Sequence, residues 1–141
     1  MKNRIKKTTV DLLNNIYSVA YWMTENENDS QNLVKKIYSD TKNKSSETEL
    51  LKTLRTCYIS QFGQSANFCI SEQPWKTNLQ LINALKDWAA DIKLSVLIHE
   101  ITGLQHQQIS DIINQPIDIV RTWLLWGRKL LVNNCEFKAS A

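Results

Sequence analysis

A chain of 141 residues is long enough for one domain or for two very small ones. Hydrophobic residues make up 43% of the chain and charged residues 22%, which is ordinary for a protein that buries a core. Only 3 Gly and 2 Pro are present, so an all-β fold rich in tight turns and a Gly-rich phosphate loop are both excluded.

The charge balance is mild, with 17 basic and 14 acidic residues and a net charge of +3. A dedicated nucleic-acid-binding protein usually has a larger basic excess. No stretch approaches the ~18 apolar residues of a membrane span, and no apolar run typical of a secretion signal follows the basic N-terminus. The three cysteines are widely spaced, which favours reduced thiols. We therefore expect a cytoplasmic protein without membrane association.

Hydrophobic periodicity predicts an amphipathic helix over residues 9–24, where apolar side chains recur every three or four positions. A polar, acidic run follows, and Asp29 or Ser30 is expected to cap a second helix. Residues 39–48 contain no apolar side chain and are expected to form a loop.

A third helix is predicted after this loop, with a capping box formed by Ser46 and Glu49. The three helices would make one small module over residues 9–61. Residues 62–76 change character and indicate a linker to a second module, because turn-forming and polar residues gather there: Gly63, Gln64, Ser65, Asn67, Ser71, Glu72, Gln73 and Pro74. The expected fold class is all-α, with two small helical modules joined by this linker.

The second module, residues 77–132, has the pattern of a helix-turn-helix. Gly103 ends an apolar stretch and suits the end of a helix, where a positive φ is required. A turn of three residues then separates a short helix over residues 105–113 from a last helix over residues 117–132. In such a pair the first helix braces the second, whose outer face can enter the major groove of DNA. The side chains expected to hold the two helices together are Leu104, Ile109, Ile112, Ile113, Val120 and Leu124.

Several short motifs follow one another along this half of the chain. They are Gly103-Leu104, Gln108-Ile109-Ser110, the turn from Pro116 to Val120, Arg121-Thr122 and Gly127-Arg128-Lys129-Leu130. With these motifs, residues 85–131 resemble region 4 of bacterial RNA polymerase sigma factors, especially the small extracytoplasmic-function type. The resemblance implies that Arg121, Thr122, Arg128 and Lys129 contact the −35 element of promoter DNA.

The N-terminal half resembles region 2 of the same family more faintly. The run from Asp29 to Lys35 falls where the family has Ala-Glu-Asp-Leu-Val-Gln, and the run from Leu50 to Gln64 falls on its promoter-melting helix. The resemblance implies that this module binds core RNA polymerase, with Asn32 and Lys35 at the partner-binding positions. It also implies a possible anti-sigma or other regulatory protein as a further partner.

Two of the five tryptophans, Trp123 and Trp126, stand where the family has arginines. Because apolar side chains replace cations there, a second hypothesis is a protein-interaction module in which both rings face a partner and DNA binding is weakened. A third hypothesis is an ordinary helix-turn-helix regulator that dimerises through its N-terminal helices.

The remaining candidate residues point to structure rather than chemistry. Trp22 and Trp88 are expected in the core. His99 and His106 are seven residues apart, but Gly103 lies between them and is expected to end the helix, so no metal site is predicted. No enzyme signature is found, and no catalytic residue or cofactor is expected.

Overall fold

The computed structural model describes residues 8–41, 45–66 and 79–127, which form helices and their connecting turns, without a strand. This confirms the all-α fold class. In chain order the helices are α1 (Thr9–Thr24), α2 (Glu27–Asp40), α3 (Glu47–Phe62), α4 (Leu79–Leu97), a π-helical turn (Ile98–Thr102), α5 (His106–Ile113) and α6 (Ile117–Gly127). Within these ranges, no helix is long and apolar enough to cross a membrane.

Helix α1 has the bounds predicted from its hydrophobic period. Thr8 caps its first turn, where the Thr8 hydroxyl accepts from the Asp11 N–H and the Asp11 carboxylate accepts from the Thr8 N–H. The helix ends at Glu25, whose left-handed φ of 54° turns the chain toward α2. Both ends are thus fixed by local hydrogen bonding.

Helix α2 begins earlier than predicted. Its N-cap is Asn26, whose side chain accepts from the Asp29 N–H at 2.8 Å, so the predicted caps Asp29 and Ser30 both lie inside the helix. Ser30 is buried, and its hydroxyl donates to the Glu27 carbonyl. Asn, Asp and Ser are all good caps, and the sequence offers all three within five residues.

Helix α3 begins as predicted, with the capping box between Ser46 and Glu49. It ends at Gly63, which has a φ of 68°. Of the predicted linker, Phe62 belongs to α3 and packs against the core, while residues 67–76 lie outside the described ranges.

Helix α4 is bent at Trp88, which has φ −131° and ψ 24°. After Leu97 the backbone widens into the π-helical turn, and Gly103, with a φ of 76°, ends it as the sequence predicted. The bend exposes Trp88, which is 38% accessible to solvent. The prediction that Trp88 lies in the core is therefore wrong, whereas Trp22 packs against the core.

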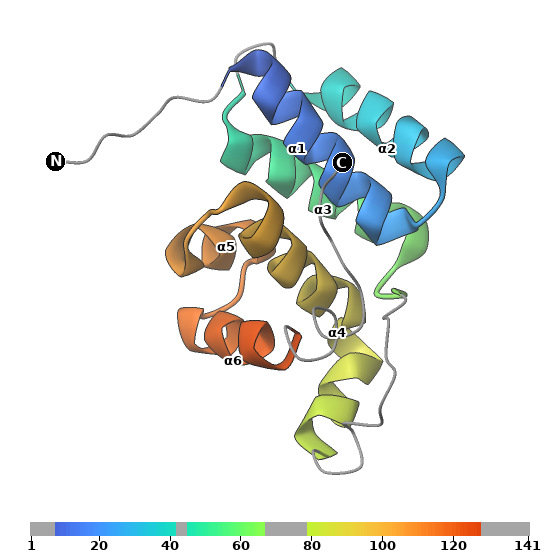
Figure 1. Ribbon diagram of the computed structural model, residues 1–141. Coiled ribbons are helices and arrows are strands. Elements are labelled where there is room, and N and C mark those ends of the chain that lie inside the picture. Colours follow the sequence, from blue (N-terminus) through green and yellow to red (C-terminus); the bar gives the residue numbers. More distant parts are fainter. Residues whose placement is uncertain (1–7, 42–44, 67–78, 128–141) are drawn as a thin grey trace, which may run out of the picture.

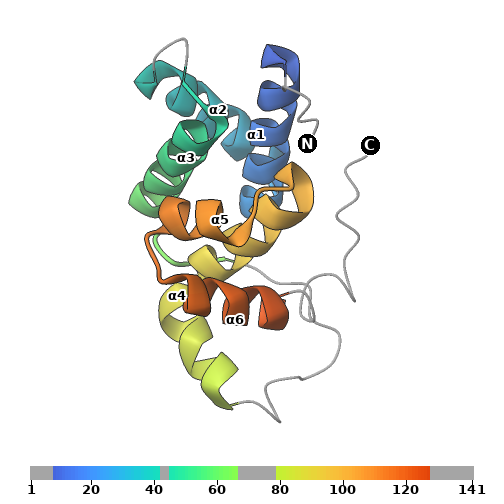
Figure 2. The same cartoon turned by 90° about the vertical axis from the view of Figure 1, so that its left-hand side faces the viewer.

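The helices form two layers that share one core. Helices α1, α2 and α3 lie on one side, and α4, α5 and α6 on the other, with α4 and α5 against α1 and α3 (Figures 1 and 2). The structure does not separate the two predicted modules, because one buried cluster draws on both. Among its members are Ile16, Val19, Leu33, Ile37, Leu51, Leu54, Ile92, Leu97, Ile98, Ile109, Ile113 and Leu124.

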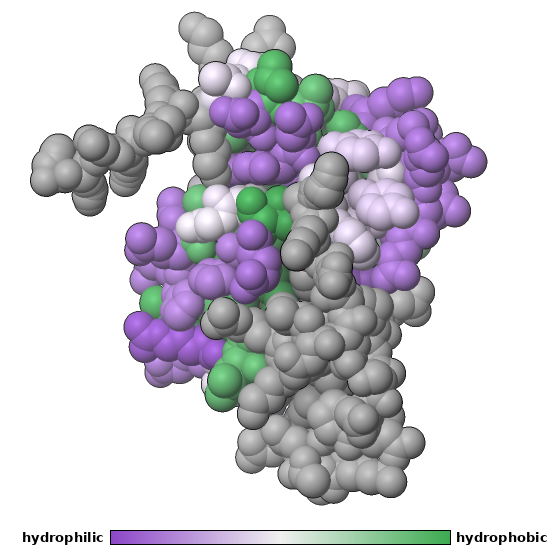
Figure 3. All heavy atoms as spheres, viewed as in Figure 1, coloured by the Kyte–Doolittle hydropathy of each residue, from purple (hydrophilic) through white to green (hydrophobic). Residues whose placement is uncertain are grey.

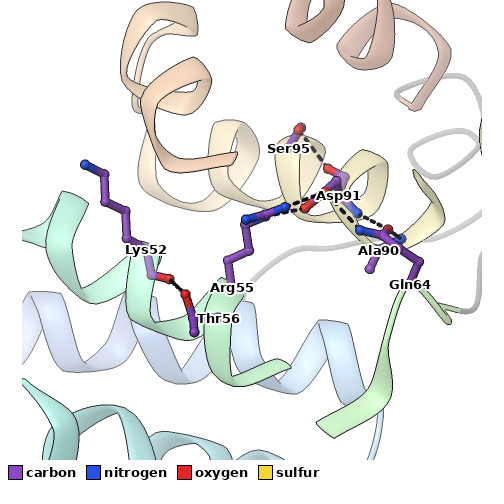
Figure 4. A network of polar contacts seen from close by, with 7 residues as sticks. All are labelled: Lys52, Arg55, Thr56, Gln64, Ala90, Asp91 and Ser95. Carbon is purple, nitrogen blue, oxygen red and sulfur yellow. Dashed lines mark hydrogen bonds and ion pairs between the residues drawn. The ribbon is translucent and has the colours of Figure 1, made fainter. Parts of the chain in front are cut away.

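A buried carboxylate joins the two layers. Asp91 of α4 is fully buried, and Arg55 of α3 contacts both of its oxygens, with distances of 2.7 Å from Nε and 3.0 Å from Nη2 (Figure 4). Gln64 donates to the same carboxylate at 3.0 Å and accepts from the Ala90 N–H at 2.9 Å. The hydrogen bond to Asp91 raises the pKa of Arg55. The carboxylate is therefore fully partnered, as a buried charge must be.

A second ion pair joins α1 to α4. Lys93 is 2% exposed, and its Nζ lies 2.7 Å from Oε2 of Glu25, the residue that ends α1. Burial lowers the pKa of Lys93, and the hydrogen bond that Lys93 donates to Glu25 opposes this shift. The two ion pairs and the shared core fix the C-terminal helices against the N-terminal ones.

Candidate nucleic-acid interface

Helices α5 and α6 form the predicted pair, joined by a short turn. Asn114 takes a left-handed conformation with φ 57° at the end of α5, and the Gln115 N–H donates to the Ser110 carbonyl at 3.2 Å. The Ser110 hydroxyl donates back to the Gln115 carbonyl. These bonds hold the turn, so the direction of α6 relative to α5 is fixed by backbone and side-chain contacts together.

The facing sides of the two helices are apolar and buried, as the sequence predicted. This inner face consists of Ile109, Ile112, Ile113, Val120 and Leu124, with Leu104 partly buried beside it. Helix α4 covers the other side of α6. One side of α6 therefore remains open to solvent, which is the arrangement that a groove-entering helix requires.

The solvent-facing side of α6 carries one described cation. Arg121 is 59% exposed, and Thr122 beside it is also exposed. The Arg121 guanidinium lies 3.7 Å from the Asp118 carboxylate one turn earlier, while the Thr122 hydroxyl donates to the Asp118 carbonyl at 3.1 Å. Because an exposed pair of this length is weak, Arg121 can exchange Asp118 for another anion.

Apolar side chains share this surface. Ile119 is 38% and Leu125 59% exposed, and Figure 3 shows hydrophobic residues interrupting the polar surface along α6 and at the beginning of α1. The described outer face of α6 is thus mixed, with one cation, one carboxylate and two exposed aliphatic side chains.

Trp123 could lie either in the core or at a partner surface, and the structure places it in the core. Its side chain is 4% exposed, and its ring lies against that of Trp88, with centroids 5.8 Å apart. The ring therefore faces the inside of the molecule and does not present itself to a partner. Trp126 is half-buried and packs against the core. The interaction-module hypothesis therefore loses Trp123, one of the two rings on which it rests.

The other predicted site residues divide into two groups. Asn32 and Lys35 are exposed on α2, at the opposite end of the molecule from α6 (Figure 1). Arg128 and Lys129 lie outside the described ranges. The structure therefore does not bring the predicted polymerase-binding and DNA-binding residues together, but places them on separate surfaces.

One feature was missed from the sequence. The π-helical turn and the turn at Gly103 bring His99 and His106 together, with ring centroids 5.6 Å apart. Both rings line a cavity of about 350 Å³ that Arg121 also lines. The signal in the sequence is the spacing of seven residues, but the spacing alone does not predict this contact because Gly103 interrupts the helix.

No described group suggests covalent or metal chemistry. Cys57 is a free, buried thiol, and burial raises its pKa, so it stays protonated and is a poor nucleophile. Among the residues that the structure describes, no three His, Cys, Asp or Glu side chains are grouped so that they could hold a metal ion.

Comparison with known proteins adds no family assignment. The chain matches no family model and has no significant match to a curated protein.

Proposed function

We propose that this protein is a sigma-factor-like transcription protein that binds promoter DNA through α5 and α6 and core RNA polymerase through its N-terminal helices. The observation that carries the proposal is the α5–turn–α6 pair, whose inner face is buried while Arg121 and Thr122 point outward from α6. This geometry is what a helix-turn-helix needs to place one helix in the major groove.

The charge on this surface supports modest rather than tight DNA binding. Phosphate contacts from Lys and Arg supply most of the sequence-independent affinity, and each contributes to the salt dependence. Arg121 is the one described cation on α6, and Asp118 stands beside it; the sequence adds Arg128 and Lys129 after the described part of the helix. Binding should therefore depend strongly on the few cations that are present.

The N-terminal part of the proposal rests on the exposed side of α2. Asn32, Lys35 and Lys36 are all open to solvent there, far from α6. Because the two surfaces are separate, DNA and polymerase can be bound at the same time by one molecule. This is the minimum requirement for a protein that brings polymerase to a promoter.

Run-off transcription with core polymerase on a pool of genomic fragments tests this function. We expect start-specific transcripts only when the protein is added, and fewer of them with Arg121→Ala. A pull-down with core polymerase separates the proposal from an ordinary helix-turn-helix regulator, which would bind DNA but not polymerase.

A protein-interaction role remains the second candidate because of Ile119 and Leu125. Leu125 lies one turn after Arg121 on the same side of α6 and could contact an apolar partner surface, whereas Ile119 is exposed on another side of the helix. Polymerase binding without transcripts and without DNA binding would favour this role.

A further inference from the structure

The cavity beside α6 contains both histidines of the chain. It is lined by the π-helical turn, the segment that begins α5 and the first half of α6, and its polar lining residues are His99, Gln105, His106, Gln107 and Arg121. Gly103, Gln105 and Gln107 are exposed, so the cavity opens to solvent on the side of the proposed DNA surface.

We propose that this cavity binds a phosphate of the DNA backbone through His99, His106 and Arg121, and that protonation of the two imidazoles makes DNA affinity rise as the pH falls. This inference rests on the proposed DNA-binding function and adds its regulation. The observation that carries it is the juxtaposition of two imidazoles and a guanidinium in one open cavity.

The geometry suits an oxyanion. The imidazole centroids lie 5.6 Å apart with an angle of 45° between the rings, which is too close to hold a phosphate between the rings but close enough for both rings to contact one phosphate beside them. Arg121 lines the same cavity and offers a planar fork of donors, which matches phosphate oxygens. The cavity volume of about 350 Å³ is more than a single phosphate group fills, which leaves room for the adjoining sugar-phosphate backbone.

Protonation of the histidines makes the cavity more positive. Two carboxylates stand close by: Glu100, whose Oε2 lies 3.5 Å from Nδ1 of His99, and Asp118, 3.7 Å from Arg121. None of the residues lining the cavity comes from α1, α3 or α4. Protonation of both imidazoles adds two positive charges beside Arg121, so the cavity then attracts an anion more strongly.

Protonation and phosphate binding should therefore assist each other. A bound anion stabilises the charged form of a neighbouring imidazole, and a charged imidazole attracts the anion, so each event favours the other by the same free energy. Imidazole is the side chain that ordinarily changes charge near neutral pH.

The test is fluorescence anisotropy with a labelled mixed-sequence DNA duplex at constant ionic strength. We expect the wild-type protein to bind about tenfold more tightly at about pH 6 than at about pH 8, since one or two extra phosphate contacts are gained. The double variant His99→Gln, His106→Gln keeps polar side chains of similar size but cannot be protonated, so its affinity should be the same at both values. Equal pH dependence in the wild type and the double variant would overturn the proposal.

A second measurement separates this site from the DNA-binding function. Sulfate, which stays a dianion over this range, is titrated into the protein at about pH 6 and about pH 8, and the ring protons of the only two histidines are followed by NMR. Saturable shifts in both rings at the lower pH, absent with chloride at matched ionic strength, are expected. If sulfate leaves both rings unchanged, the oxyanion site is wrong even where DNA is bound. If sulfate binds but the duplex does not bind at either pH, the site stands and the proposed DNA-binding function fails.

Discussion

At the scale of single residues, the ion pair between Arg55 and Asp91 has the largest expected effect on stability. Both Asp91 oxygens are bonded by Arg55, and the carboxylate is fully buried, so losing the partner leaves an uncompensated buried charge. We expect Arg55→Ala to lower the free energy of unfolding by about 3 kcal/mol, measured by urea denaturation. The control is Lys52→Ala, an exposed cation on the same helix, which should change it by less than about 0.5 kcal/mol. Equal effects would show that the pair contributes nothing specific.

Tyr58 is expected to make the stability of the fold depend on pH. Its hydroxyl donates to the Ser65 carbonyl at 2.7 Å, and burial raises its pKa to about 12, with Glu25 adding to the shift. The folded state therefore holds this proton more tightly than the unfolded state, whose tyrosine ionises at about pH 10. Stability contributed by Tyr58 is complete below about pH 10 and is lost as the pH rises toward 12.

The matching experiment compares wild type with Tyr58→Phe in urea denaturation from neutral to alkaline pH. At neutral pH the variant should be less stable by about 1 kcal/mol, because a hydrogen bond is lost. Between about pH 10 and 12 the wild type should lose roughly 2–3 kcal/mol that the variant does not lose, so the difference shrinks or reverses. Tyr21→Phe, at a more exposed position, serves as control. A constant difference across the range would contradict the burial argument.

At the scale of helices, the turn at Gly103 decides how the candidate interface is built. Its φ of 76° joins the π-helical turn to α5, and no atom lies within 4 Å of the position that a Cβ would take. Gly103→Ala should therefore cost about 1–2 kcal/mol through backbone strain alone, as measured by thermal or urea unfolding. Unchanged stability would mean that the turn relaxes to another conformation.

The helices also show what the sequence could predict. The period of α1 and the Ser46–Glu49 capping box follow from local rules, and both predictions are confirmed. The predicted start of α2 is wrong because several good N-cap residues lie within a few positions of one another. Local rules therefore predict the presence of a helix more reliably than the residues at which it begins and ends.

Tertiary geometry explains the predictions that failed. The non-helical backbone at Trp88 cannot be read from side-chain periodicity, and it moves Trp88 outward while Trp123 packs beneath it. Likewise, the approach of His99 and His106 depends on a π-helical turn followed by a left-handed glycine. The α5 and α6 helices and the exposed position of Arg121 could be predicted, but the cavity next to them could not.

At the scale of the whole molecule, the shared core predicts that the chain unfolds as one unit. Residues of α1, α3, α4 and α5 belong to the same buried cluster, and two ion pairs cross between the layers. We expect a single urea transition that coincides in far-UV circular dichroism and tryptophan fluorescence. Two separate transitions would instead support independent N-terminal and C-terminal modules.

The shared core also bears on the proposed function. If DNA and polymerase bind at opposite ends of one rigid body, their relative position is set by the core rather than by a flexible linker. The proposed function then requires promoter and polymerase to fit the arrangement seen here, with α2 and α6 on separate surfaces.

The claim that the outer face of α6 contacts DNA is tested most directly by the salt dependence of duplex binding. Fluorescence anisotropy at several salt concentrations is measured for wild type, Arg121→Ala and Lys36→Ala, which removes the same charge from exposed α2. The account predicts that Arg121→Ala weakens binding and reduces the slope of log K against log salt by about 1, whereas Lys36→Ala matches the wild type. Identical affinities and slopes for all three proteins would contradict it.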